Sequence, residues 1–238
     1  MQQGSEVTVK KDKENPLQEV LEFAASVIWL GIAFGIAIAG GTEAFKDLVS
    51  LRTTIIESLV VVFFAFVFHE LAHRVVARRY GYKAVYHVWI PGLLLAMAAS
   101  LAGFLFAAPG GVHIEMGQNL SEARAKLGKS ALAGPVVNII LSIVFAVLSF
   151  ALIYFLDFYL ASTGKTLAEV ESTVNLLWGI TIIGVEINAW LAVFNLIPFG
   201  NLDGYKVFQW NKKVWTVVFV ISIGLYFLMT WGQSKLFG

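Results

Sequence analysis

The chain has no cysteine and little charge. None of its 238 residues is Cys, and Asp, Glu, Lys and Arg together make up 14%. The absence of thiols excludes disulfide bonds, thiolate metal sites and thiol proteases, so any metal must be bound by His, Asp or Glu. It leaves the redox compartment undetermined. A net charge of +1 without a polybasic tract gives no sign of a nucleic-acid partner.

Internal repeats, low-complexity tracts and loops long enough for a soluble domain are also missing. Apolar residues are abundant instead: they make up 58% of the chain, and the mean hydropathy is +0.76. These values lie outside the range of ordinary soluble domains. We therefore expect an all-α polytopic membrane protein with a polar N-terminal tail, 1–16, and a single membrane-embedded domain, 17–238.

Six apolar runs are close to or above the roughly 20 residues that a helix needs to cross the hydrocarbon core. They cover residues 23–40, 54–78, 88–109, 131–156, 174–198 and 214–231. The first run is longer than the core of a signal peptide, and we interpret it as a retained signal anchor.

The second run contains the pentad His69-Glu70-Leu71-Ala72-His73. On a helix the two imidazoles stand four positions apart on one face and can bind one zinc ion, with Glu70 placed to activate a water molecule. Each ionisable group at the centre of a membrane helix costs on the order of 3 kcal/mol. A purely structural role for His69 and His73, as interhelical hydrogen-bonding groups, leaves Glu70 unexplained.

A third zinc ligand must come from elsewhere, and Asp203 is the best candidate. It follows Pro198 and Gly200, which should break a helix and let the carboxylate turn toward the ion, although an Asp-Gly pair is also ordinary turn chemistry. Glu186 lies 17 residues earlier, about 25 Å along a continuous helix. The remaining alternatives are His87, His113 and Glu115.

The number of membrane crossings decides whether Asp203 can reach the two histidines. If the run 88–109 spans, three crossings separate His73 from Asp203, and the residues lie on opposite faces. If it enters and returns, as its glycines and prolines permit, two crossings remain and the ligands meet. This second topology has about five spans and a re-entrant hairpin between the second and third spans. It also puts 13 of the 17 Lys and Arg residues on the cytoplasmic side, as the positive-inside rule requires.

On these motifs the sequence resembles the site-2 protease family of intramembrane zinc metalloproteases, and specifically a compact archaeal-type member without PDZ or CBS domains. The matching motifs are His69-Glu70-Leu71-Ala72-His73, Gly134-Pro135-Val136-Val137-Asn138, Asn195-x-x-Pro198 and Leu202-Asp203-Gly204. The resemblance covers about residues 54–205. It departs from the common pattern in the loop, where Phe199 and Tyr205 stand in place of a second proline and a second glycine.

The resemblance implies Zn²⁺ as cofactor, His69, His73 and Asp203 as its ligands, Glu70 as catalytic base and Asn195 as a substrate-positioning residue. Asn138 is a second polar residue that could hold substrate backbone, and ordinary interhelical hydrogen bonding explains either asparagine equally well.

We therefore expect a multi-pass protein of the cell membrane, with its N-terminus and active site toward the cytoplasm, that cleaves transmembrane protein substrates in regulated intramembrane proteolysis. Its remaining partner is the lipid bilayer, and the sequence leaves its oligomeric state undetermined. Two alternatives stay open: a non-catalytic scaffold stabilised by zinc, and a transporter using Glu70 and Glu186. Within the enzyme class, a membrane metalloprotease with a glutamate as third ligand is a further alternative.

Overall fold

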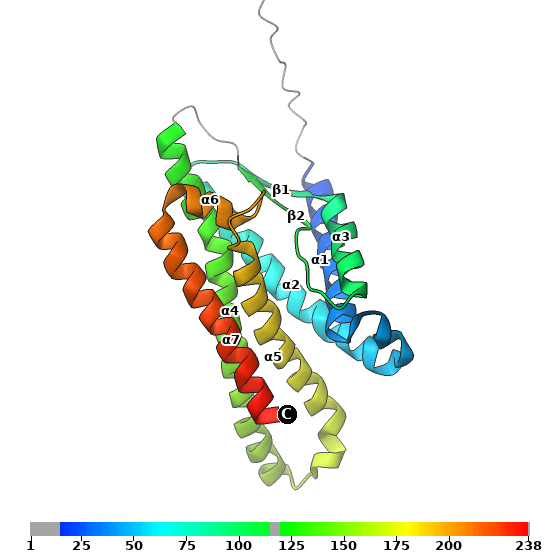
Figure 1. Ribbon diagram of the computed structural model, residues 1–238. Helices are drawn as coiled ribbons and strands as arrows, with labels where there is room; N and C mark the ends of the chain where they lie inside the picture. Colours follow the sequence, from blue (N-terminus) through cyan, green and yellow to red (C-terminus); the bar gives the residue numbers. More distant parts are fainter. Residues whose placement is uncertain (1–14, 115–119, 238) are drawn as a thin grey trace, which may run out of the picture.

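The computed structural model describes residues 15–114 and 120–237, which form a bundle of long helices with a small two-stranded ribbon at one end (Figure 1). The elements in chain order are α1 (Pro16–Ile38), the 3-10 helix η1 (Gly41–Lys46), α2 (Leu48–Arg79), β1 (Ala84–Val88), α3 (Ile90–Leu101), β2 (Gly110–Ile114), α4 (Leu120–Thr163), α5 (Leu167–Asn195), α6 (Asp203–Trp210) and α7 (Lys212–Phe237).

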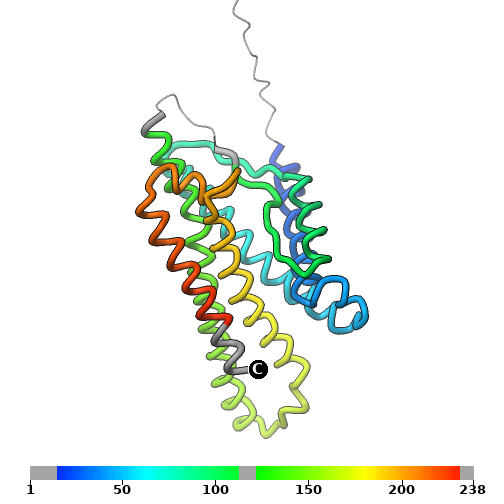
Figure 2. Tube along the Cα trace, viewed as in Figure 1, coloured from blue at the N-terminus to red at the C-terminus, as the bar shows by residue number. Residues whose placement is uncertain are grey.

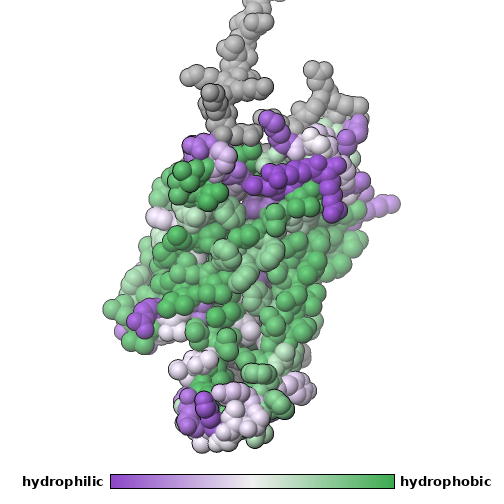
Figure 3. Space-filling view, turned by 180° about the vertical axis from the view of Figure 1, so that it is seen from behind, coloured by the Kyte–Doolittle hydropathy of each residue, from purple (hydrophilic) through white to green (hydrophobic). Residues whose placement is uncertain are grey.

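Five of the described helices, α1, α2, α4, α5 and α7, are long and apolar enough to cross a membrane. The helix α3 has 12 residues, about 18 Å at 1.5 Å per residue, and is too short to cross a hydrocarbon core of about 30 Å. Apolar residues cover most of the flank of the bundle, and hydrophilic residues gather toward its two ends (Figure 3). The expected fold class, an all-helical multi-pass membrane protein, is confirmed.

Polar side chains outside the apolar runs mark where the long helices begin. Asn15 accepts a hydrogen bond from a backbone N–H at the start of α1, and Asp47 does the same for α2. Thr166 and Glu169 form a reciprocal capping box at the start of α5. Helices α1 and α2 therefore extend several residues beyond the apolar runs that indicated them.

The segment between α2 and α4 leaves one end of the bundle and returns to it (Figure 2). Strands β1 and β2 pair antiparallel, with Tyr86 opposite Val112, so the two ends of the segment lie together. Two candidate spans, α4 and α5, remain between His73 and Asp203, which is the number that the crossing argument requires. The cytoplasmic orientation of this end stays a prediction.

Helices α2, α4 and α5 pack around a line of buried polar groups. The Asn138 side-chain amide donates to Asn188 Oδ1 at 2.9 Å and to the Ala65 carbonyl at 3.4 Å, which joins all three helices. The hydroxyl of Ser142 donates to the Val185 carbonyl at 3.0 Å. Such interhelical hydrogen bonds stabilise helix packing where no water competes for them. They fix the depth of α2 relative to α4 and α5, and with it the position of the pentad.

Candidate metal centre

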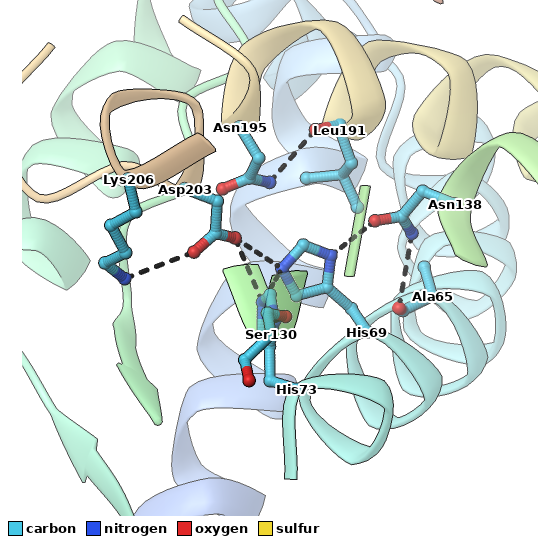
Figure 4. Close-up of polar contacts among 9 residues, drawn as sticks. All are labelled: Ala65, His69, His73, Ser130, Asn138, Leu191, Asn195, Asp203 and Lys206. Atoms are coloured by element: carbon cyan, nitrogen blue, oxygen red, sulfur yellow. Dashed lines mark hydrogen bonds and ion pairs between the residues drawn. The ribbon is translucent and has the colours of Figure 1, made fainter. Parts of the chain in front are cut away.

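His69 and His73 of α2 meet Asp203 at the first turn of α6 in a buried cluster (Figure 4). The two histidine Nε2 atoms are 2.9 Å apart. Asp203 Oδ2 lies 3.3 Å from Nε2 of His69 and 3.0 Å from Nε2 of His73. Three side chains that are far apart in the sequence therefore direct one ligand atom each at a common point.

The other ring nitrogen of each histidine has its own partner, and these partners determine the tautomers. His73 Nδ1 lies 2.7 Å from the Ser130 carbonyl oxygen, which can only accept, so Nδ1 carries the proton. His69 Nδ1 lies 2.6 Å from Asn138 Oδ1, while the amide nitrogen of Asn138 donates elsewhere. The Nε2 lone pairs of both neutral rings therefore face the carboxylate, and the cluster needs a positive charge among its acceptors, either a proton or a metal cation.

The spacing of the three ligand atoms suits zinc. Tetrahedral bonds of about 2.0–2.1 Å to nitrogen and oxygen put neighbouring ligand atoms about 3.3 Å apart. The observed separations of 2.9, 3.0 and 3.3 Å are close to this value. Two imidazoles and a carboxylate are also a donor set that zinc accepts, and three protein ligands leave the fourth position open, as in catalytic sites.

A glycine of α4 leaves room for the two imidazoles. A Cβ atom on Gly134 would lie 2.5 Å from His73 Nε2 and 2.6 Å from His69 Nε2. These distances are far below van der Waals contact, so any other residue at position 134 would push the rings away. The glycine of the Gly134-Pro135 pair thus serves the metal centre directly.

Asp203 is positioned by a corner between α5 and α6. Helix α5 ends at Asn195, and Gly204 then packs so closely that a Cβ there would lie 2.1 Å from the Leu196 carbonyl oxygen. Lys206 Nζ lies 3.2 Å from Asp203 Oδ1. Burial alone would raise the pKa of the Asp203 carboxyl, but its interactions with His73, Lys206 and His69 hold the pKa well below its usual value. The residue therefore stays in the ionised form that a metal requires.

Glu70 lies next to this cluster and faces a cavity. Its side chain is buried, its Oε2 atom has no hydrogen-bond partner among the described residues, and the backbone of Val112 lies close to its carboxyl group. A cavity of about 220 Å³ lies between α1 and α2, and Phe23, Leu71 and Glu70 are among its lining residues. The carboxylate is thus buried, has one oxygen without a partner among the described residues and is open to a space that can hold a small group.

The structure places the two candidate substrate-binding asparagines differently. Asn195 is half-buried at the end of α5, and its amide nitrogen donates to the Leu191 carbonyl at 3.0 Å. Asn138 is 0% exposed, and its oxygen is engaged by His69. The sequence did not indicate this link between Asn138 and His69, nor the contact of His73 with the Ser130 carbonyl, because a backbone carbonyl has no signature in a sequence.

Of the alternative ligands, the two whose side chains are described, Glu186 and His87, do not join the cluster. Glu186 is half-buried on α5, one of the candidate spans, and lies outside the group formed by His69, His73 and Asp203. His87 lies in β1, opposite Gly111 of β2. His113 is in β2, its side chain is not described, and Glu115 lies outside the described residues.

Comparisons with known proteins agree with this geometry. The model of Peptidase family M50 matches residues 57–228, a range that includes the pentad, Gly134 and Asp203. A protein of Methanocaldococcus jannaschii named "Putative zinc metalloprotease MJ0611" is 38% identical over 176 residues, which cover 73% of this chain and 81% of that protein. No solved structure matches the chain.

Proposed function

Because this chain belongs to peptidase family M50, we propose that it is an intramembrane endopeptidase whose substrates are transmembrane segments of other membrane proteins. Its family and its five candidate spans make it a multi-pass membrane zinc metalloprotease. The observation that carries the proposal is the convergence of three buried ligand atoms next to a buried glutamate that lacks a partner for one oxygen.

In this proposal His69, His73 and Asp203 hold the zinc ion. When bound, zinc lowers the pKa of a water molecule toward about 7 and polarises the carbonyl of the scissile peptide bond. Asn138 and the Ser130 carbonyl hold the protons on the two Nδ1 atoms, so that each Nε2 presents its lone pair to the metal.

Glu70 acts as the general base and then as the general acid. Its free carboxylate oxygen takes a proton from the attacking water and later gives that proton to the leaving amine nitrogen. The surroundings of Glu70 support this role, since it directly follows the ligand His69 in the chain and its Oε2 atom has no partner among the described residues.

The substrate binds in an extended form along β2. A transmembrane helix hides its carbonyls in internal hydrogen bonds, so it must unwind locally before attack. In an antiparallel pair of strands, the backbone groups of two opposite residues either bond to each other or point toward the two outer edges. The Tyr86 N–H bonds to a side chain of α1, so Val112 opposite it directs its backbone groups away from β1, toward Glu70. An extended peptide that pairs with this edge lies next to the base.

Asn195 of α5 is the polar residue that we assign to the substrate backbone. Asn138 contributes through the orientation of His69, because its side chain is fully buried and its amide is engaged by protein groups.

The test is cleavage of a transmembrane reporter by purified protein in detergent or proteoliposomes. Glu70→Gln should keep the zinc content of the wild type and lose cleavage by a factor of about 10² to 10⁴, because it removes the proton carrier alone. Glu186→Gln is a matched control, since it replaces another membrane carboxylate outside the metal cluster, and it should keep both zinc and cleavage. A non-catalytic scaffold and a transporter would both show no cleavage in the wild type or in any variant.

A further inference from the structure

Two glutamates of α1 bond to the outer edge of β1. The N–H of Tyr86 donates to Glu19 Oε1 at 2.9 Å, and the N–H of Val88 donates to Glu22 Oε2 at 3.1 Å. Residues two apart on a strand direct their backbone groups to the same edge, and residues three apart on a helix lie on the same face. One face of α1 therefore supplies acceptors along a strand edge in the way that a neighbouring strand would.

We propose that Glu19 and Glu22 are positioning residues that occupy the outer edge of β1 and so restrict an incoming substrate strand to the outer edge of β2. This inference rests on the proposed protease function and deepens it. Among the described residues the sheet has two strands, so its edges are the α1 side of β1 and the Glu70 side of β2. With the first edge occupied, an extended peptide has only the edge next to Glu70 to pair with.

Glu19 also connects the hairpin to the helix that carries the catalytic base. Its carboxylate pairs with Arg74 of α2, which stands one helical turn after Glu70. The same carboxylate oxygen that accepts from the Tyr86 N–H contacts Arg74, so α1, α2 and β1 meet at this atom. A shift of α1 relative to α2 and β1 would therefore break two contacts of this carboxylate at once.

The aromatic ring of Tyr86 strengthens this attachment. Tyr86 is 1% exposed, and its hydroxyl donates to Ser26 Oγ of α1 at 2.8 Å. The ring also packs edge-on against Phe23 of α1 and Phe66 of α2, which stack on each other, with centroid distances of 5.2 and 5.7 Å. Glu19, Glu22 and Ser26 thus hold β1 through three hydrogen bonds from one helix face. The opposite strand β2 is carried with β1, which places the Val112 N–H at Glu70.

The same ion pair lies where two cavities meet. Glu19 and Arg74 line both the cavity of about 220 Å³ that reaches Glu70 and a second cavity of about 490 Å³ lined by Arg78 and Lys83. The contacts that hold β1 to α1 therefore also border the space next to the base.

Glu22 gives the cleaner test, since Glu19 also pairs with Arg74. Glu22→Ala should raise KM for a transmembrane substrate about tenfold, with a smaller change in kcat, and mass spectrometry of the products should show cleavage at additional peptide bonds. Glu22→Gln keeps an oxygen that can accept from the Val88 N–H and should restore KM and the single cleavage position. Glu43→Ala, which removes an exposed glutamate paired with Lys46, is the control and should behave as the wild type.

Crosslinking tests the edge itself without relying on turnover. The chain has no native Cys, so single cysteines can be placed at the opposed positions His87 of β1 and Gly111 of β2 in the Glu70→Gln background. A Cβ at Gly111 meets no atom within 4 Å. A substrate carrying one cysteine should crosslink to position 111, and should reach position 87 only when Glu22 is alanine.

These outcomes separate the inference from the proposed function. Unchanged KM, an unchanged cleavage position and an unchanged crosslinking pattern in Glu22→Ala would overturn the role of the glutamates while wild-type cleavage stands. Equal crosslinking at positions 87 and 111 in the protein that keeps Glu22 would overturn it as well. Cleavage that survives in Glu70→Gln would instead contradict the proposed function.

Discussion

Replacing Asn138 with alanine should loosen the zinc ion although Asn138 is not one of its ligands. The substitution removes the oxygen that lies 2.6 Å from His69 Nδ1, and it leaves Asn188 Oδ1 without its donor at 2.9 Å. An unsatisfied buried polar group costs about 1–3 kcal/mol. Loss of the partner of a zinc-bound histidine typically lowers metal affinity by about 10 to 100-fold, equivalent to about 1.4–2.7 kcal/mol.

The assay is competition for zinc with a chelator of known affinity, followed on the purified protein. Asn138→Ala should release zinc at a correspondingly lower chelator concentration, and cleavage should recover when zinc is added in excess, because all three ligands and Glu70 remain. Ser142→Ala is the matched control: it removes another buried α4 hydrogen bond, to the Val185 carbonyl, without touching a histidine. Equal zinc affinity in Asn138→Ala and the wild type would refute the claim that Asn138 orients His69.

Two further substitutions test the space and the edge at the site. Gly134→Ala should expel zinc, because its Cβ would lie 2.5 Å from His73 Nε2. The overpacking should also destabilise the fold by about 1–3 kcal/mol. Metal analysis and thermal unfolding measure the two effects, and full zinc occupancy would contradict the expectation. Val112→Pro should raise KM for a transmembrane substrate at unchanged zinc content, because it removes an N–H that faces Glu70 and not β1, while Val112→Ala should keep the wild-type KM.

The metal cluster could be predicted from the sequence because each part of it carries a local signal. The spacing of His69 and His73 puts both rings on one helix face, and Pro198 with Gly200 marks the break that frees Asp203. The crossing count then excluded the topology in which they could not meet. The observed convergence of the three side chains agrees with that reasoning, and ligation itself stays a prediction.

The hairpin was harder to predict, because its strands carry no pattern that distinguishes them from loops. Residues 84–88 and 110–114 are five residues each, and they pair across a separation that includes the helix α3. The expectation that 88–109 enters the membrane and returns stays a prediction, and it contained neither of the two strands. Long-range pairing of short strands depends on contacts that a local window cannot contain.

The contacts that support the site were the hardest part to predict from the sequence. Glu19 and Glu22 precede the first apolar run, where they look like the polar start of a helix. Their function depends on which backbone N–H groups the fold brings to them, Tyr86 and Val88, more than 60 residues later. Hydropathy likewise located the apolar stretch of α1 but not its first residue, which the cap at Asn15 and Pro16 determines.

Zinc stoichiometry of the purified wild type and of Asp203→Asn tests the central claim most directly. The account predicts one zinc ion per wild-type chain and a substantial loss in Asp203→Asn, because the amide lacks the charge that balances the cation next to His69 and His73. Glu186→Gln, measured alongside, should retain the full complement. Unaltered zinc content in Asp203→Asn, or loss confined to Glu186→Gln, would contradict the three-residue site.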